Sequence, residues 1–523
     1  MNTSNILLYA SPVIGFFSSN LILHSQNQIV ERPNIVIILA DDMGYGDVSF
    51  NNHLARTYTP NIDKFAENGL TFTDAHSGGS VSIPSRYGLL TGRYFFRAPK
   101  QSSYWGYLPP LIEKERETIG TLMQKAGYTT ACIGKWHLGL KWGLNDISKP
   151  QIDNEKVSGY TNTDFSSPVT GGPNNLGFDY YFIHPASLDM PPYTFIRNGK
   201  VIDTNIVLMA DAYPHTLDGT IDAYDKRNTN ENDIYWGRGV WWRNGEMSKS
   251  FKVEDCFDII VDEGISFIEK HIANNGKNPF MLYLPLTGPH TPWVPNDTFK
   301  GSSAMGTYGD FISQVDHVVY RINEVIKRLN IEENTLVIFA SDNGTPWEEE
   351  DIQSYGHLSN ASRRGQKGDI WDGGHHIPLF IKWPAKIKQS QSYDYTISLL
   401  DIFASFAEMT GQPIDKKYAE DSFSFYDVLM GNITDPSRDH IVYSAGNKLA
   451  IKKGDWKYID GLGSGGFTTP SNVNPVPNGP KGQLYNLKED PMETTNLYFQ
   501  NLGKVKELSD LLHQISEQGF SRY

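Results

Sequence analysis

The sequence has few cysteines, no excess of basic residues and no hydrophobic run long enough to cross a membrane. Its 523 residues include only Cys132 and Cys256, which argues against a disulfide framework; the two could pair, but buried free thiols are the simpler expectation. Lys and Arg number 46 against 60 Asp and Glu, giving a formal net charge of −14 that argues against a nucleic-acid partner. Any anionic substrate must therefore be recognised by a local basic pocket.

The first apolar run, residues 6–17, is interrupted by Ser11, Pro12 and Gly15 and is too short for a membrane span. It is typical of the hydrophobic region of a secretory signal peptide, although no Lys or Arg precedes it. We therefore expect residues 1–25 to be a signal peptide. The protein is expected to be exported, to the periplasm or the outside of a bacterial cell.

The length allows one large domain and a smaller one. Buried-type strands alternate with helical patterns, which predicts an α/β domain over residues 31–437, with a large, mostly parallel mixed sheet between helices. Short strands, turns and a closing helix at 502–518 predict a C-terminal α+β subdomain with a small antiparallel sheet over 438–523. Within it, residues 461–480 are rich in Gly, Pro and Asn and are expected to be mobile or to face the substrate.

One stretch combines a hydroxyl, a cation and a helix start. Ser82 is expected just before a helix whose first turn contains Pro84 and which ends at Gly92. Arg86 falls about one turn further on. Since helix N-termini attract anions, this stretch predicts an anion-binding pocket, the alternative being a serine that caps an ordinary helix.

Polar pairs follow two buried-type strands. Asp41 and Asp42 come after the run 34–40, and Asp342 and Asn343 come after 335–340. Open α/β sheets place their sites at these strand ends, and oxygen ligands of this kind suit calcium or magnesium. Acidic turn residues facing water are the alternative for either pair alone.

Further basic side chains occupy similar places. Lys135 and His137 follow the strand expected at 128–133, and they can point into one pocket because alternate residues of an extended chain share a side. His290 lies in a proline-stiffened loop after the strand at 279–286. Lys367 precedes another strand at 379–383.

The Ser82 stretch, S-x-P-S-R-x-x-x-L-T-G-R, resembles the maturation signature of type I sulfatases in its serine form. The other polar residues occur in the order of that family, so the resemblance spans nearly the whole mature chain. It implies an alkaline-phosphatase-like fold and oxidation of Ser82 to Cα-formylglycine by an anaerobic-type sulfatase-maturating enzyme. It also implies a calcium ion held by the modified residue 82 and by Asp41, Asp42, Asp342 and Asn343.

The resemblance assigns roles to the basic residues as well. Lys135 and Lys367 would stabilise charge on the sulfuryl oxygens, and His290 would protonate the leaving oxygen. His137 would accept a proton from the hydrated aldehyde, and Arg86 would support the aldehyde and the metal-binding carboxylates. The sequence departs from the family at Asp372 and His376, where Glu and Arg are usual, and the second change affects packing or substrate contact.

The implied activity is hydrolysis of a carbohydrate sulfate monoester, with a 6-O-sulfated galactose or N-acetylgalactosamine as the favoured substrate. Expected substrate contacts are Asp189, His215, His375 and His376. Two other functions stay open at this point. One is a phosphatase or phosphodiesterase of the same superfamily that uses unmodified Ser82, and the other is a sulfated-glycan-binding protein without activity.

Overall fold

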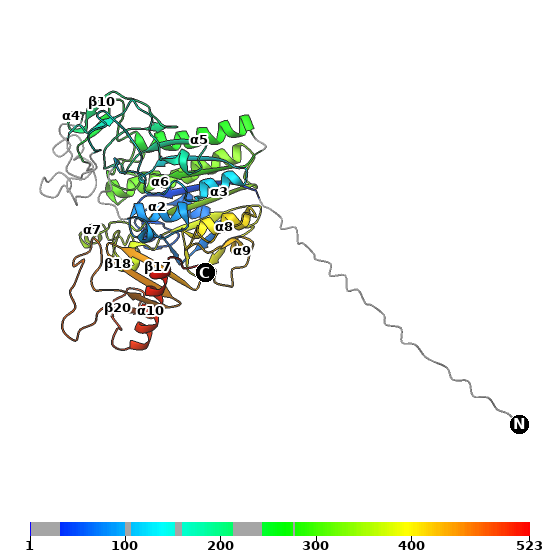
Figure 1. Cartoon of the computed structure of the whole chain (residues 1–523), viewed down its shortest axis with the longest axis vertical. Helices are drawn as coiled ribbons and strands as arrows, with labels where there is room; N and C mark the ends of the chain where they lie inside the picture. Colours follow the sequence, from blue (N-terminus) through cyan, green and yellow to red (C-terminus); the bar gives the residue numbers. More distant parts are fainter. Residues whose placement is uncertain (2–31, 100–105, 152–158, 213–242, 276–277, 523) are drawn as a thin grey trace.

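The computed structural model describes the chain except for residues 2–31, 100–105, 152–158, 213–242, 276–277 and 523 (Figure 1). The expected signal peptide and the predicted substrate residue His215 lie outside the described residues. Among the described helices, none combines the length and apolar character that crossing a bilayer requires. Cys132 and Cys256 are both buried and unpaired, as the simpler expectation had it.

A ten-stranded mixed sheet organises the main domain. Its five central strands are parallel to their neighbours. Antiparallel pairing begins at β14 on one side and at β8 on the other. In spatial order the strands are β15 (Gln391–Tyr393), β2 (Leu70–Phe72), β14 (Leu379–Lys382), β13 (Thr335–Ser341), β1 (Asn34–Ala40), β12 (Phe280–Pro285), β4 (Thr129–Lys135), β7 (Tyr180–His184), β8 (Ile196–Arg197) and β9 (Lys200–Val201).

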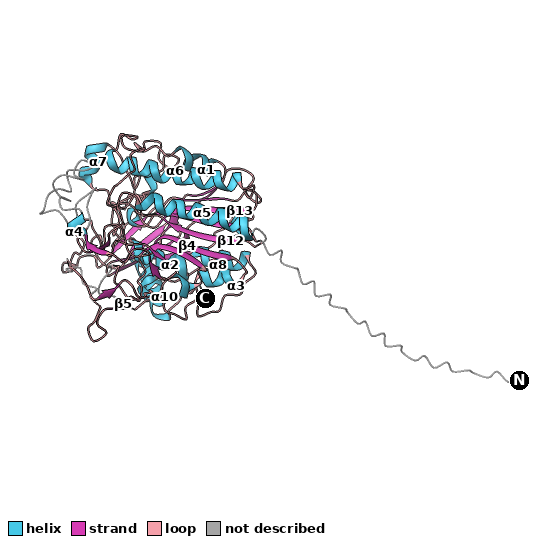
Figure 2. Cartoon of the chain, turned by 90° about the horizontal axis from the view of Figure 1, so that it is seen from above, coloured by secondary structure: helices cyan, strands magenta, loops and turns pink. Residues whose placement is uncertain are grey.

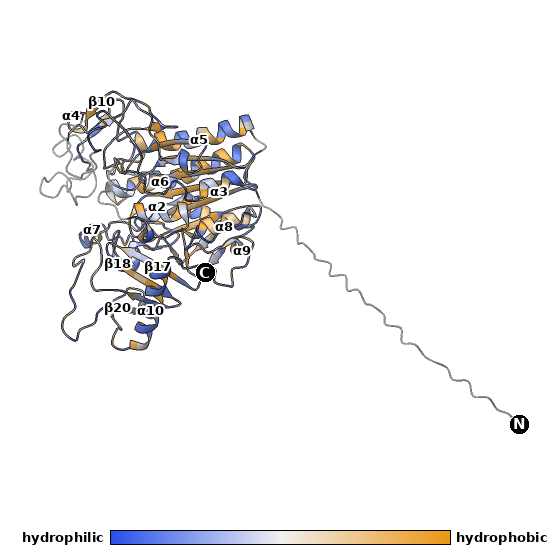
Figure 3. Ribbon diagram, viewed as in Figure 1, coloured by the Kyte–Doolittle hydropathy of each residue, from blue (hydrophilic) through white to orange (hydrophobic). Residues whose placement is uncertain are grey.

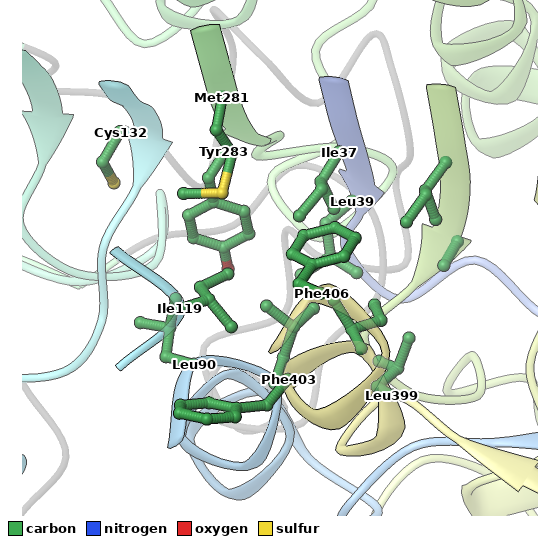
Figure 4. Close-up of a cluster of buried hydrophobic side chains, with 14 of the residues drawn as sticks. Ile37, Leu39, Leu90, Ile119, Cys132, Met281, Tyr283, Leu399, Phe403 and Phe406 are labelled. Carbon is green, nitrogen blue, oxygen red and sulfur yellow. The ribbon is translucent and has the colours of Figure 1, made fainter. Parts of the chain in front are cut away.

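The central strands are hydrophobic on both faces because helices cover both. Every residue of β1 is buried, and successive side chains alternate between two cores. Ile37 and Leu39 belong to one core, with Met281 and Tyr283 of β12 beside them in Figure 4, whereas Ile38 belongs to the other. This continuous apolar run is the signal from which the sequence predicted a parallel sheet.

Helices pack on both faces of the sheet, and Figure 2 shows the helices around the strands. The first face carries α2 (Ser82–Thr91), α3 (Ile119–Lys125) and α8 (Asp401–Met409), whose Phe403 and Phe406 reach the core in Figure 4. The opposite face carries α1 (Pro60–Glu67), α5 (Cys256–Asn275) and α6 (Gly306–Arg328). In Figure 3 the strands between these layers are the most hydrophobic part of the chain. The α/β architecture predicted from the sequence is confirmed.

The remaining elements lie around this three-layer body. Short strands pair as β3 (Ala75–His76) with β16 (Ile397–Ser398), β5 (Gly143–Leu144) with β6 (Thr163–Asp164), and β10 (Ile206–Leu208) with β11 (Glu246–Ser248). Three short helices are α4 (Met209–Ala212), α7 (Glu349–Tyr355) and α9 (Tyr426–Leu429). The insertion between β4 and α5 thus contains more pairing than its irregular sequence indicated.

The C-terminal segment forms its own antiparallel sheet, in the order β17 (His440–Ala445), β18 (Lys448–Lys453), β19 (Trp456–Ile459) and β20 (Gln483–Asn486). Helix α10 (Leu502–Gln518) packs on it. Buried ion pairs join it to the main domain. Arg438 binds Asp401 at 3.0 Å, and Lys457 binds Asp372 at 3.1 Å.

The chain enters β1 on the right of Figure 1, so the carboxyl ends of the parallel strands lie on the left. At this edge β1 ends before Asp41, β13 ends before Asp342, and β4 ends with Lys135. Because neighbouring parallel strands end together, residues far apart in sequence meet here.

Candidate active site

Helix α2 presents Ser82 to the strand ends. Ser82 is the first residue of this helix rather than the residue before it, and Val81 occupies the cap position without a side-chain hydrogen bond. The expectation that Ser82 precedes the helix, or caps it, is therefore corrected. Its hydroxyl instead donates to Asp41 Oδ1 at 3.1 Å. Gly92 ends the helix in the left-handed conformation, as predicted.

Lys135 joins Ser82 to Asp41. Its ammonium group donates to Asp41 Oδ2 at 2.6 Å, to Ser82 Oγ at 3.2 Å and to Ser187 Oγ at 3.1 Å. All four side chains are buried. The sequence indicated residues 187–193 as a candidate substrate loop, but it did not predict that Ser187 itself would contact Lys135.

Arg86 supports the carboxylates from within the helix. It binds Asp342 Oδ2 through Nε at 3.1 Å and Nη2 at 2.8 Å, donates to the carbonyl oxygen of Lys135 at 3.2 Å, and lies 3.5 Å from Asp41 Oδ1. Burial lowers its pKa, but Asp342 and Asp41 outweigh that effect, so the pKa is raised and the group stays charged.

Asp42 turns away from the strand direction. Its φ of 65° lies in the left-handed region, so the two adjacent aspartates point to different partners. Asp42 Oδ1 accepts from Asn343 Nδ2 at 2.7 Å, and Oδ2 accepts from Lys367 Nζ at 2.6 Å. Asp342 Oδ1 accepts the backbone N–H of Asp42 at 3.1 Å.

A further carboxylate, Asp47, fixes the loop that follows Asp41 and Asp42. It is fully buried and accepts from the backbone of Gly44 and from Tyr308, His357 and Ser359. Four donors on one carboxylate tie the loop to α6 and to residues 357–359. Asp47 thereby holds the backbone that delivers Asp41 and Asp42.

The pKa values follow from burial and pairing. Burial raises the pKa of Asp41, but Lys135, His290 and Arg86 outweigh it, so the pKa is lowered. Burial lowers the pKa of Lys135, with Asp41 opposing it only in part. For Lys367, Asp42 overcomes the effect of burial and raises the pKa. The pocket thus combines three carboxylates with three cations in a desolvated setting.

The donor set at the strand ends fits a hard cation. Asp41, Asp42 and Asp342 offer carboxylate oxygens, and the buried Oδ1 of Asn343 has no hydrogen-bond partner in the described part of the chain. A buried acceptor without a partner is costly, and a metal ion would satisfy it. An all-oxygen set of this kind suits calcium or magnesium rather than a softer metal.

His290 lies over this cluster in the loop after β12. Its Nδ1 lies 2.6 Å from the carbonyl oxygen of Thr291, and its ring lies 3.4 Å from Ser187 Oγ. Asp42 Oδ2 lies 3.6 Å from Nε2, and Asp189 Oδ1 lies 4.0 Å from Nδ1. The contact with Thr291 therefore holds the ring in one orientation, and Asp42 and Asp189 lie close enough to stabilise a protonated imidazole.

Asp189 lines the same pocket, consistent with its predicted role as a substrate contact. Its Oδ2 binds Arg243 Nη1 at 2.5 Å, whereas its buried Oδ1 has no hydrogen-bond partner among the described residues. Burial raises the pKa of Asp189, but Arg243 and His290 lower it well below the usual range. Arg243 was missed, because it follows an irregular stretch without a motif.

His137 lies two residues after Lys135. Its φ of 55° is in the left-handed region, and its backbone N–H donates a hydrogen bond to the carbonyl oxygen of Pro185. His375 and His376 are buried and paired with neighbouring side chains. His375 Nδ1 lies 3.0 Å from His76 Nδ1, and His376 lies 3.2 Å from Asp372. Their contact with a substrate stays a prediction.

A family model described as Sulfatase matches residues 33–412 of the chain. Over 505 residues the chain is 34% identical to an N-acetylgalactosamine-6-O-sulfatase of Bacteroides thetaiotaomicron, covering 93% of each chain. Over 429 residues it is 28% identical to an arylsulfatase of Hemicentrotus pulcherrimus, covering 82% of this chain and 67% of the relative.

Solved structures give a similar result. One solved structure is described as belonging to work on the metabolism of multiple glycosaminoglycans by Bacteroides thetaiotaomicron. It is 31% identical to this chain, with a TM-score of 0.75, and the match covers 93% of this chain and 99% of that one. A phosphonate monoester hydrolase of Agrobacterium radiobacter is 17% identical, with a TM-score of 0.56 covering 94% of this chain and 96% of that one. This second likeness concerns the fold alone.

Proposed function

Because this chain belongs to the sulfatase family and is a sulfuric ester hydrolase, we propose that it removes the 6-O-sulfate of an N-acetylgalactosamine or galactose unit. The observation that carries this proposal is the 34% identity to an N-acetylgalactosamine-6-O-sulfatase across 93% of both chains. The pocket agrees with a small anionic ester, because Lys135 and Lys367 converge on it with Ser82.

We propose that Ser82 is converted to Cα-formylglycine by an anaerobic-type sulfatase-maturating enzyme, and that the oxygen cluster binds calcium. Formylglycine supplies a hydrated aldehyde as the nucleophile in this family, and calcium supplies positive charge for the sulfuryl oxygens. Asp41, Asp42, Asp342 and Asn343 would hold the ion together with residue 82. The buried, unpartnered Oδ1 of Asn343 supports this assignment.

The basic residues bind and orient the ester. Lys135, held between Asp41 and Ser187, and Lys367, held by Asp42, would contact sulfuryl oxygens and stabilise the charge that builds on them. Both are fixed by pairs before substrate arrives, so little reorganisation is needed on binding.

His290 would protonate the sugar oxygen as it leaves. A hydrogen bond from Nδ1 to the Thr291 carbonyl leaves Nε2 as the nitrogen that faces the pocket, 3.6 Å from Asp42. The assigned proton transfer therefore runs from Nε2 to the alkoxide oxygen. His137 remains the proposed acceptor of a proton from the hydroxyl group at residue 82.

Asp189 and Arg243 would recognise the sugar. The unpartnered Asp189 Oδ1 can accept from a hydroxyl, and Arg243 holds the other carboxylate oxygen in place. A pair of this kind rejects a sugar that lacks the matching hydroxyl, because its buried polar atoms are then left unpaired. We also propose export, on the basis of residues 1–25.

The test is mass spectrometry of the peptide that carries Ser82, from protein co-expressed with the maturating enzyme, together with hydrolysis assays. Loss of two hydrogen atoms at residue 82 and release of sulfate from N-acetylgalactosamine 6-sulfate are expected. Ser82→Ala is the matched control and should release none. Unmodified serine with hydrolysis of phosphate esters would establish a phosphatase instead, and no hydrolysis by fully converted protein would refute the sugar assignment.

A further inference from the structure

Tyr308, near the start of α6, extends its hydroxyl from the helix layer to two loops of the active site. The residue is buried, and its phenolic oxygen lies 2.6 Å from Asp47 Oδ2 and 2.9 Å from Thr345 Oγ1. Burial and Asp47 hold the pKa of Tyr308 well above its usual value, so the phenol keeps its proton. Because a phenol has one proton and a carboxylate accepts, that proton bonds to Asp47, and the Thr345 hydroxyl donates to the phenolic oxygen. The three side chains therefore form a hydrogen-bonded chain of fixed direction.

The Asp47 end of this chain fixes the loop that follows Asp42. Asp47 Oδ2, the oxygen that binds Tyr308, also accepts from the backbone N–H of Gly44 at 2.7 Å, two residues after Asp42. An added Cβ on Gly44 would lie 2.2 Å from the carbonyl oxygen of Ser359, so the two backbones touch there. The loop that carries Asp42 therefore depends on where Tyr308 holds this carboxylate oxygen.

The Thr345 end reaches the segments that carry Asn343 and Lys367. Thr345 lies two residues after Asn343, and its carbonyl oxygen accepts from the backbone N–H of Lys367 at 3.1 Å. The side chains of both segments meet on Asp42, which accepts from Asn343 Nδ2 at 2.7 Å and from Lys367 Nζ at 2.6 Å. One buried hydroxyl thus connects the Asp42 loop with the two segments whose side chains bind Asp42.

The ring of Tyr308 is held independently of its hydroxyl. It packs against two tryptophans, with ring centroids 4.8 Å from Trp347 and 5.0 Å from Trp293. Trp293 lies three residues after His290, in the same loop after β12. A phenylalanine at position 308 would keep both ring contacts and lose only the hydroxyl. The substitution therefore separates the link to Asp47 and Thr345 from the packing of the His290 loop.

We propose that Tyr308 is a positioning residue of the active site, whose hydroxyl fixes the Asp42 loop relative to the segments of Asn343 and Lys367. It keeps together the side chains proposed to bind calcium, Asp42 and Asn343, and the one proposed to bind the sulfate group, Lys367. Groups that orient metal ligands in this way commonly determine metal affinity without touching the ion. This inference rests on the proposed calcium and sulfate sites and adds to them a residue from the opposite layer of the fold.

The test measures calcium binding to metal-free protein by isothermal titration calorimetry and, separately, hydrolysis of N-acetylgalactosamine 6-sulfate and of nitrophenyl sulfate. Both use protein that mass spectrometry shows to be converted at residue 82. The variants are Tyr308→Phe, Thr345→Val, Thr345→Ser and the double variant Y308F/T345V. Tyr393→Phe is the matched control, because Tyr393 is also buried and donates its hydroxyl to the carbonyl of Asp435 at 2.9 Å, on the edge strand β15.

We expect Y308F to weaken calcium binding roughly tenfold, because Asp47 and Thr345 lose the partner that they share. Saturating calcium should restore most of its kcat, whereas KM should stay raised because the Lys367 segment is no longer fixed. The loss should be equal on the sugar sulfate and on nitrophenyl sulfate, since the phenylalanine ring still packs against the His290 loop.

The variants at Thr345 test the direction of the chain. T345V leaves the bond from Tyr308 to Asp47 intact and should weaken calcium binding only roughly threefold, whereas T345S keeps the hydroxyl and should match the unchanged protein. The double variant should bind calcium no more weakly than Y308F, because both substitutions remove the same contact. Y393F should change neither calcium affinity nor kcat/KM.

An unchanged calcium affinity and KM in Y308F would overturn the proposal, even if the variant is less stable. Additive losses in the double variant would overturn it as well, because the two hydroxyls would then act separately. If Y308F does not fold, equal calcium affinities of T345V and T345S would have the same meaning. Unchanged protein that binds no calcium or releases no sulfate would refute the underlying function instead, so the two failures are distinguishable.

Discussion

Replacing Lys457 by Met should destabilise the protein by about 3 kcal/mol, at the lower end of the cost of breaking a buried ion pair. The ammonium group is fully buried and lies 3.1 Å from Asp372, 2.9 Å from Glu493 and 3.3 Å from His375. Its removal leaves two carboxylates in a desolvated pocket. Burial and Asp372 raise the pKa of Glu493 to about 7 despite Lys457, so Glu493 can take up a proton and limit the loss.

The same reasoning predicts that Glu493→Gln costs less than the lysine variant, and that the double variant recovers about 1 kcal/mol relative to K457M alone. The free energy of unfolding is measured by chemical denaturation followed by tryptophan fluorescence. Lys453→Met is the control, since Lys453 on neighbouring β18 is 41% exposed at its side chain and should be neutral. A K457M effect as small as that of K453M, or no recovery in the double variant, would refute the buried-pair argument.

Three further predictions concern the site and its support. His290→Ala should lower hydrolysis of a sugar sulfate by about 10²–10⁴, but much less that of nitrophenyl sulfate, whose leaving group needs no proton; equal losses on both would contradict the acid role. Asn343→Leu should abolish the rise in Tm on adding calcium, whereas an unchanged rise would place the ion elsewhere. Burial lowers the pKa of His76 and of His375, so the unfolded chain binds more protons, and stability should fall as the pH drops below about 6.5, by up to about 1.4 kcal/mol per pH unit for each ring. His375→Asn should reduce this dependence of stability on pH, whereas His513→Asn, at an exposed ring, should not. A pH dependence unaffected by H375N would refute the argument that burial of His375 contributes to it.

Much of the fold could be read from local patterns. The continuous apolar run at β1 requires burial on both faces, which only a covered parallel sheet provides. The helical spacing of apolar residues in α6 (Gly306–Arg328) is a local pattern of the same kind, and the residues that follow this spacing are buried: Ile312, Val315, Val319, Ile322 and Ile326. Polar residues directly after such strands must meet at the carboxyl edge, so the approach of Asp41 to Asp342 followed from topology.

Other site residues had no such signal. Arg243 lies far along the insertion between β4 and α5, where no hydrophobic period fixes the backbone, and packing of that insertion brings it to Asp189. Ser187 follows the carboxyl end of β7, but its sequence alone did not show that it contacts Lys135. His375 and His376 are a different case. Two adjacent histidines after Gly374 suggested a binding element, but the C-terminal subdomain and the segment around His76 bury both rings.

By itself the sequence determined the parallel sheet, the order of polar residues at its edge and the presence of a short helix that ends at Gly92, because each depends on neighbouring residues or on a short period. The tertiary structure decided which side chains form hydrogen bonds, ion pairs and packing contacts with one another. Only folding brings Lys457 to Asp372, Asp189 to His290 and Tyr308 to Asp47, and these contacts depend on how separate segments pack. The energy of a buried contact comes from excluding water around both partners, and that exclusion is a property of the packed chain rather than of any stretch within it.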